Sequence, residues 1–242
     1  MYLIFSANMI VGFFMRYEEI IERLKSLSDP DARKGMARYG INPLNNFGVS
    51  IYKLRPLAKE IGINHDLALQ LWDSGIHDAR LLAVFIDDPD KVTGEQMDTW
   101  AVDFNSWDIC DQACTSLFDQ TTFAWKKVFE WAKRDEEFVR RAAFSLIAGL
   151  AVHDKTTNDQ AFEDTFPLIK AYAVDERNYV KKAVNWALRN IGKRNMDLNK
   201  KAVQLAEEIL LIHSKSACWI ARDAIRELKS EKIQMRLLRK KK

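Results

Sequence analysis

A short residue pattern recurs at a fixed interval in the second half of the chain, and this interval constrains the fold more than any other feature of the sequence. Residues 139–142 (VRRA) are matched 41 positions later by residues 180–183 (VKKA) and, after a further 41, by residues 221–224 (ARDA). A period of about 40–47 residues is typical of repeats that consist of two helices. Because such repeats stack side by side, they form a curved solenoid with a concave binding surface.

Helical periodicity also covers most of the chain outside this repeat. Only nine glycines and five prolines occur in 242 residues, so few positions interrupt helices. The pattern predicts helices over residues 17–26, 29–39, 50–61, 64–74, 76–85, 94–104, 106–118, 122–134, 136–152, 159–173, 176–194, 199–211 and 214–228. No linker rich in Pro, Gly or Ser divides them. We therefore predict an all-α protein, a curved α-solenoid of HEAT-like helical repeats, with residues 15–238 as a single domain.

The two ends of the chain differ from this domain. Residues 1–14 are apolar but too short to span a bilayer, and they lack the basic start of a signal peptide. Because an amphipathic pattern starts at Met15, we treat residues 1–14 as an N-terminal extension and expect no membrane association. Residues 239–242 (RKKK) form a basic tail, and a charge run of this kind is usually solvated.

The cysteines and histidines are not spaced as metal ligands. Cys110 and Cys114 lie one helical turn apart, Cys218 is distant, and the four histidines show no HxxxH spacing. Neither GxxxxGKS/T nor GxGxxG occurs, which disfavours a nucleotide-dependent enzyme. We therefore expect no metal and no cofactor. An odd number of cysteines suits a reducing compartment, and we expect the protein in the cytoplasm.

Basic residues gather along one face of the helix predicted at residues 176–194. Lys182, Trp186, Arg189 and Lys193 follow one another at helical spacing. A tryptophan among cations could cap one of them by a cation–π contact, or it could meet a base or sugar of a nucleic acid. We favour the nucleic acid because three cations share this face. The basic positions repeated at 140, 181 and 222 fit a phosphate-binding ridge and ordinary solvent-facing charge about equally well.

The segment at residues 106–111 (SWDICD) places an aromatic ring beside an acid. Trp107 and Asp111 are four residues apart, so they share one face of a helix. A core tryptophan next to a surface acid would explain such a pair in an ordinary protein. In a basic setting, however, a single carboxylate is a poor phosphate ligand and is suited to stabilise positive charge on a bound molecule.

An ordered set of motifs extends from about residue 36 to the C-terminus. The motifs are MARY at 36–39, FGV at 47–49, LW at 71–72, AR at 79–80, SWDICD at 106–111, FVRRAA at 138–143 and VKKAVNWALR at 180–189. In this order and at these separations, the chain resembles the AlkD-type DNA glycosylases. These enzymes consist of HEAT-like repeats and remove alkylated bases from DNA.

The resemblance implies roles for the residues that match the motifs of the family. Asp111 matches the catalytic aspartate, and Trp107 and Trp186 match the two active-site tryptophans. Arg141 matches the arginine that holds the DNA backbone at the lesion, and Tyr39 matches a tyrosine that borders the DNA-facing cleft. All of these residues are present, so the resemblance implies an active member of the family.

The implied reaction is hydrolysis of the N-glycosidic bond of purines that alkylation at N3 or N7 has made cationic, in duplex DNA and without a base-flipping pocket. Lys182, Arg189 and Lys193 are expected to contact the backbone of the DNA. Two positions depart from the family pattern: Ser106 stands where a tryptophan is frequent, and Cys110 replaces an aliphatic residue. The first departure could alter the substrate range.

The partner implied is double-stranded DNA with alkylated bases, bound by a monomer associated with the nucleoid. Two other functions stay open. A non-catalytic HEAT-repeat protein that binds damaged, distorted or branched DNA would share the basic face and would not need Asp111. A protein scaffold of the armadillo type would bind a peptide on its concave side, and its affinity would lack the steep salt dependence of DNA binding.

Overall fold

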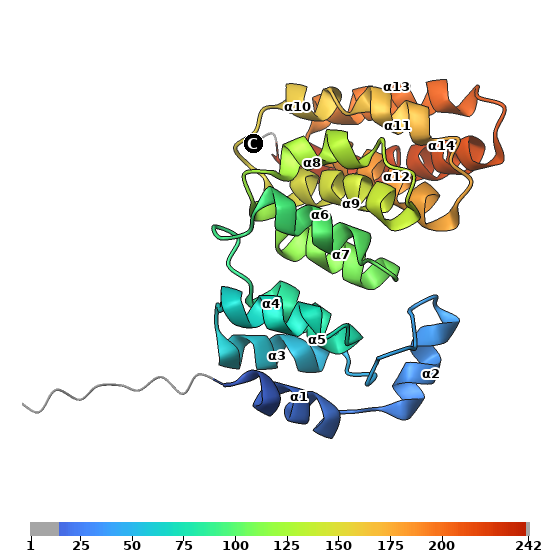
Figure 1. Cartoon of the computed structure of the whole chain (residues 1–242). Helices are drawn as coiled ribbons and strands as arrows, with labels where there is room; N and C mark the ends of the chain where they lie inside the picture. Colours follow the sequence, from blue (N-terminus) through green and yellow to red (C-terminus); the bar gives the residue numbers. More distant parts are fainter. Residues whose placement is uncertain (1–14, 241–242) are drawn as a thin grey trace, which may run out of the picture.

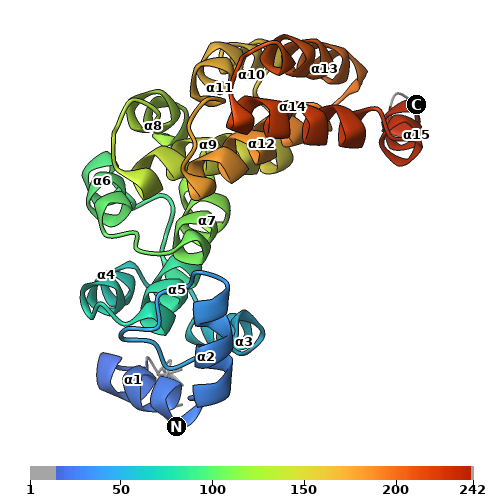
Figure 2. The same ribbon diagram turned by 90° about the vertical axis from the view of Figure 1, so that its right-hand side faces the viewer.

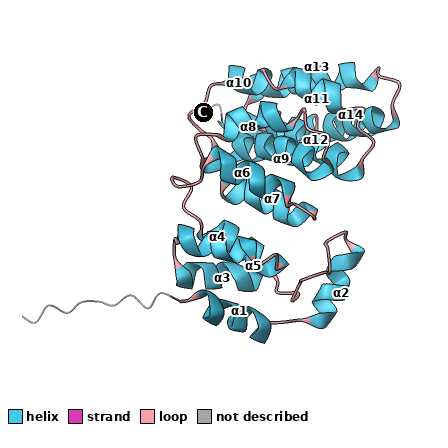
Figure 3. Cartoon of the chain, in the orientation of Figure 1, coloured by secondary structure: helices cyan, strands magenta, loops and turns pink. Residues whose placement is uncertain are grey.

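A computed structural model describes residues 15–240, and every regular element in that range is a helix (Figure 3). The elements are α1 (Tyr17–Ser26), α2 (Pro30–Arg38), α3 (Ile51–Ile61), α4 (His65–Asp73), α5 (His77–Ile86), α6 (Gly94–Val102), α7 (Trp107–Ser116), η1 (Phe118–Gln120), α8 (Ala124–Trp131), α9 (Glu137–His153), α10 (Asp159–Glu163), α11 (Phe166–Tyr172), α12 (Asn178–Ile191), α13 (Met196–Leu210), α14 (Lys215–Leu228) and α15 (Glu231–Lys240). The predicted all-α class is confirmed.

The helices stack in two layers along an arc (Figures 1 and 2). The inner layer follows the order α3, α5, α7, α9, α12 and α14, and each of these helices contacts the next. Helices α6, α8, α11 and α13 cover the other side and pack against this inner layer. Figure 2 shows the resulting curvature, with α1–α5 at one end and α13–α15 at the other. The predicted curved solenoid is therefore confirmed.

Small residues at the repeated positions let the inner helices approach closely. Ala142, Ala183 and Ala224, each 41 residues from the next, are fully buried at 0% exposure. Large aliphatic residues fill the space around them, and each fully buried Leu or Ile stabilises the fold by about 1.5–3 kcal/mol. On α12, Val180, Val184, Leu188 and Ile191 are all buried in this way.

The helix predicted at residues 159–173 is in fact two helices, α10 and α11. The chain turns at Thr165, whose buried hydroxyl donates a hydrogen bond of 2.6 Å to the carbonyl of Phe162. Pro167 follows in the first turn of α11. Proline lacks an N–H and disfavours the helical conformation in the preceding residue, so it starts a helix more readily than it continues one. Periodicity alone does not register this break.

Sequence periodicity missed α15, which includes two residues assigned above to a basic tail. Ile233 and Leu237 are 6% and 1% exposed, and they anchor α15 against α14. The helix continues to Lys240, past the predicted domain end at residue 238. The predicted extension at residues 1–14 and the last residues of the tail, 241–242, lie outside the described part of the chain. Within residues 15–240, no helix has both the length and the hydropathy required to cross a membrane.

Candidate functional site

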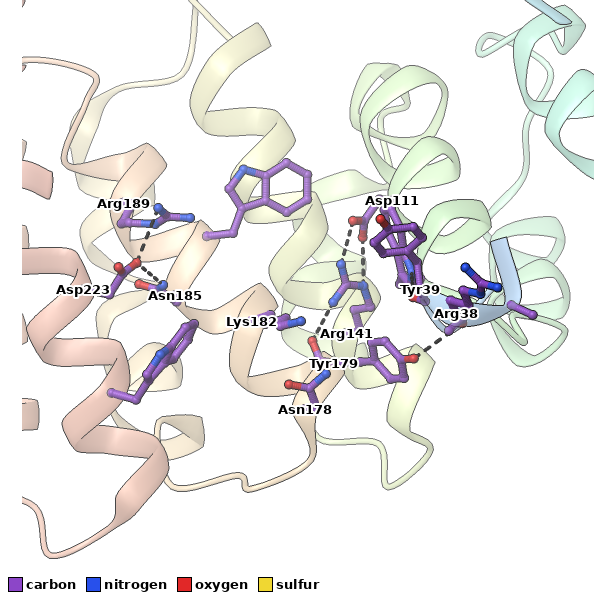
Figure 4. A pocket seen from close by; sticks show the side chains of 15 residues that line it. Arg38, Tyr39, Asp111, Arg141, Asn178, Tyr179, Lys182, Asn185, Arg189 and Asp223 are labelled. Atoms are coloured by element: carbon purple, nitrogen blue, oxygen red, sulfur yellow. Dashed lines mark hydrogen bonds and ion pairs between the residues drawn. The ribbon is translucent and has the colours of Figure 1, made fainter. Parts of the chain in front are cut away.

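The concave side of the arc contains a cleft of about 950 Å³ (Figure 4). It is lined by the end of α2, by the two residues that follow α2, and by the inner helices α7, α9, α12 and α14. Its lining residues are Ala37, Arg38, Tyr39, Gly40, Trp107, Asp111, Arg141, Asn178, Tyr179, Lys182, Asn185, Trp186, Arg189, Trp219 and Asp223. The structure thus brings Trp186 of α12 into the same cleft as Trp107 and Asp111 of α7, which are distant from it in sequence.

Helical spacing explains why these side chains face the same way. Positions four residues apart lie on one face of a helix, as Trp107 and Asp111 do on α7 and as Lys182 and Trp186 do on α12. Residues that are 41 positions apart lie on equivalent faces of successive inner helices. Asp223 on α14 follows Lys182 by that interval and also lines the cleft.

Asp111 is held on both carboxylate oxygens. The Nε of Arg141 donates to Oδ1 at 2.9 Å, and its Nη2 donates to Oδ2 at 2.6 Å. The hydroxyl of Ser145 donates a third hydrogen bond to Oδ1 at 2.8 Å. This is a bidentate, charge-assisted pair, and it fixes the orientation of the carboxylate. Burial raises the pKa of Asp111, while Arg141 and Ser145 act in the opposite direction.

The position of Arg141 differs from that expected of a residue that contacts the DNA backbone. Its side chain is 6% exposed, and its Nη1 donates to the carbonyl of Tyr179 at 2.6 Å. Figure 4 shows the guanidinium between Asp111 and Tyr179. In this structure Arg141 lines the cleft but donates to Asp111 and Tyr179, so it positions Asp111, and its contact with the DNA backbone stays a prediction.

The segment after α2 borders the cleft opposite Arg141. Trp107 donates from Nε1 to the carbonyl of Tyr39 at 2.9 Å, and the hydroxyl of Tyr179 lies 3.4 Å from the carbonyl of Gly40. Gly40 has a φ of +78°, and a Cβ there would lie 2.0 Å from the Tyr179 hydroxyl, so only glycine fits. Tyr39 is 77% exposed at the edge of the cleft, where the resemblance placed it.

The three cations expected on α12 have different surroundings. Lys182 is exposed and forms no ion pair with the described residues. Arg189 instead pairs with Glu227 and, at 3.5 Å, with Asp223. Lys193 pairs with Glu227 at 2.9 Å and does not line the cleft. The predicted basic stripe is thus largely neutralised by acids of α14, and of its cations Lys182 is the one open to a ligand.

Several residues at the cleft were not selected from the sequence, among them Arg38, Tyr179 and Trp219. Arg38 is exposed there, Tyr179 bridges to Gly40, and Trp219 is 42% exposed on α14. Trp219 follows Asn178, another lining residue, by 41 positions, so the repeat interval could have identified it. Nothing in the pattern around Arg38 or Tyr179 reveals their place, because α2 and α12 meet only through the tertiary fold.

The site shows no set of metal ligands. Among residues 15–240, no group of three His, Cys, Asp or Glu side chains is placed to hold a metal ion. Cys110 and Cys114 are buried next to α9, and their thiols donate to the carbonyls of Phe138 and Ala142. Burial raises the pKa of Cys114, so its thiol stays protonated and is a poor ligand.

Several known proteins are similar to this chain in sequence or in architecture. Two uncharacterized proteins, from Listeria innocua and Listeria monocytogenes, are each 22% identical over 216 residues, which cover 86% of this chain and 94% of the relative. A solved structure superimposes with a TM-score of 0.78 at 23% identity, covering 92% of this chain and 96% of the other. That structure is described as representing a new family related to the HEAT-like repeat DNA glycosylases, with affinity for branched DNA structures.

The sequence model of one family matches most of the chain. It is described as that of the DNA alkylation repair enzymes, and the match spans residues 20–228. The match confirms the resemblance that rested on the motifs between residues 36 and 189. The structural similarity independently supports the HEAT-like architecture. The chain therefore belongs to the DNA alkylation repair enzyme family.

Proposed function

We propose that this protein is a DNA glycosylase that hydrolyses the N-glycosidic bond of cationic N3- or N7-alkylated purines in duplex DNA. The observation that carries the proposal is the meeting of Trp107, Asp111 and Trp186 in one cleft. Membership of a DNA alkylation repair family supports DNA as the substrate.

The chemistry of the reaction suits this set of side chains. A purine alkylated at N3 or N7 is already positively charged and leaves readily, and departure of the base creates oxocarbenium character on the deoxyribose. The carboxylate of Asp111 would stabilise that charge and orient water. Trp107 and Trp186 would offer their aromatic faces to the sugar and the cation.

Arg141 and Ser145 act through Asp111 in this proposal. A carboxylate in a half-dry cleft tends to take up a proton, and burial indeed raises the pKa of Asp111. The guanidinium of Arg141 opposes this tendency and keeps the charge available. Both residues are therefore positioning residues, and they hold the acid that faces the sugar.

Open cations supply the affinity for the DNA backbone. Lys182 and Arg38 are exposed at the cleft, and both can reach phosphates without giving up an ion pair with the described residues. A cleft that binds the backbone does not need to enclose the base, so the target can stay in the stack. We further propose that the protein works as a monomer in the cytoplasm, associated with the nucleoid.

The test measures release of free base from duplex DNA that contains N7-methylguanine. Asp111→Asn should lower the rate by about 100-fold or more while duplex binding is largely retained. The matched control is Asp73→Asn, since Asp73 is exposed at the end of α4, away from the cleft. If Asp111→Asn released base as fast as the parent, the role given to Asp111 would be wrong. No release by the parent protein would overturn the proposal.

The ion pair between Asp111 and Arg141 favours a second candidate function, which is binding of branched DNA without catalysis. Both oxygens of its carboxylate are already bonded to Arg141, so in the free protein its charge is compensated. A non-catalytic protein that binds branched DNA needs the cleft and its cations but no free acid, and the structural relative is described as having affinity for branched DNA. Tighter binding of a four-way junction than of a duplex of equal length, with no base release, would establish this alternative.

A further inference from the structure

A second hollow adjoins the cleft along α14. It has a volume of about 460 Å³ and is lined by Lys215, Cys218, Trp219, Arg222, Asp223 and Arg226. Trp219 and Asp223 line the main cleft as well, so the two hollows adjoin each other at these residues. A strand leaving the cleft past α12 would therefore run directly onto this surface.

Trp219 is the aromatic centre of this second hollow. It is 42% exposed, in contrast to Trp72, Trp100 and Trp131, which are 1%, 3% and 1% exposed in the core. The Nζ of Lys181 lies 5.3 Å from the centre of the Trp219 ring. An exposed indole next to cations is the arrangement on which bases of single strands stack.

The charges around Trp219 favour an anionic chain. Lys215 and Arg222 are exposed and form no ion pair with the described residues. The one acid of the hollow, Asp223, is already engaged by Arg226, by Arg189 at 3.5 Å and by the Asn185 amide at 2.7 Å. Phosphates that approach Lys215 and Arg222 therefore meet little uncompensated negative charge.

We propose that this surface binds an unpaired DNA strand that continues from a duplex seated in the cleft, with a base stacked on Trp219 and phosphates on Lys215 and Arg222. The strand must be unpaired because the faces of bases within a duplex are covered by their neighbours. The inference rests on the proposed binding of DNA in the cleft, and it does not depend on catalysis. It makes the junction between duplex and single strand the preferred ligand.

The experiment compares three lesion-free DNA ligands at one fixed salt concentration. The first is a blunt duplex, the second carries a single-stranded thymidine extension, and the third carries an abasic extension of equal length. The parent protein should bind the thymidine extension about tenfold more tightly than the blunt duplex. The abasic extension should raise the affinity over that of the blunt duplex by a smaller factor, because it offers phosphates without bases.

Variants identify the surface responsible. Trp219→Ala should remove the preference for the thymidine extension over the abasic one, and Trp219→Phe should keep most of it. Arg222→Ala should reduce the gain from both extensions, whereas Lys200→Ala, on the outer helix α13, should leave both gains unchanged. Circular dichroism shows whether each variant is folded, and the exposed position of Trp219 makes loss of the fold unexpected.

Several results would overturn the inference. Equal affinity of the parent for all three ligands would do so, as would an undiminished preference in Trp219→Ala or equal binding of thymidine and abasic extensions. Base release from a blunt N7-methylguanine duplex is measured separately. Base release without a preference for extensions would refute this inference alone, and the reverse result would refute only the proposed catalysis.

Discussion

Helices α9 and α12 are consecutive members of the inner layer, yet their equivalent cations have opposite surroundings. Arg141 on α9 and Lys182 on α12 occupy the same repeat position, 41 residues apart. Arg141 is buried and bonded to Asp111 of α7, whereas Lys182 is exposed in the cleft and without an ion pair to the described residues. The repeat therefore determines which face a residue lies on, and the residues of the neighbouring inner helices determine whether its charge is compensated.

The largest expected effect is on stability, and it comes from removal of Arg141, the cation that is paired with Asp111. Arg141→Ala leaves the carboxylate of Asp111 buried without its partner, and the free energy of unfolding should fall by about 3–5 kcal/mol. Lys182→Ala, the matched change at the same repeat position, should change it by no more than about 0.5 kcal/mol. Urea unfolding measures both. Similar losses in the two variants would contradict the contrast between the helices.

A smaller effect is expected on DNA binding when the open cation is removed. Lys182→Ala should weaken duplex binding by about three- to tenfold and reduce the slope of log K against log salt by about 0.9, since one phosphate contact is lost. Lys200→Ala on α13 serves as the control because Lys200 is exposed on the outer layer. An unchanged salt slope in Lys182→Ala would show that Lys182 does not contact phosphate.

The smallest effect concerns the acid that neutralises the rest of the α12 stripe. Burial opposes ionisation of Glu227, but Lys193 and Arg189 outweigh it and lower the pKa of Glu227 below its ordinary 4.5. Its contribution to stability is therefore complete above that pH and is lost as pH falls through the lowered pKa. The free energy of unfolding of the parent should exceed that of Glu227→Gln by up to about 1 kcal/mol at pH 7, as for a partly exposed ion pair. The difference should shrink as the pH falls below 4.5 and through the lowered pKa of Glu227. A difference that did not depend on pH would exclude this ion pair as its cause.

The sequence was a good guide to whatever depends on local spacing. Period and helical pattern placed Ala142, Ala183 and Ala224 at the contacts between inner helices, and they put Trp107 and Asp111 on one face of α7. The break at Thr165 escaped because it depends on a local hydrogen bond that periodicity does not contain. The last helix, α15, was missed although its buried residues Ile233 and Leu237 have helical spacing.

Partners across helices could not be predicted in the same way. Spacing assigned Arg189 and Lys193 to a face of α12 but carried no information on Glu227, which lies on the next inner helix. For the same reason, the bond between Arg141 and Asp111 was not foreseen, although both residues had been selected as site residues. Pairwise chemistry in a solenoid depends on how neighbouring repeats are stacked, and one sequence alone does not specify that geometry.

The glycine that follows Tyr39 has a mechanical consequence. Helix α2 has no buried residue of its own, yet its end is tied to α7 through Trp107 and to α12 through Tyr179, on either side of α9. These two hydrogen bonds connect the end of α2 to α7 and α12. A ligand that changes the distance between α7 and α12 would therefore strain them. Because Trp107 donates one of these bonds, the ring beside Asp111 is coupled to the end of α2, and a displacement of that segment would also move the ring.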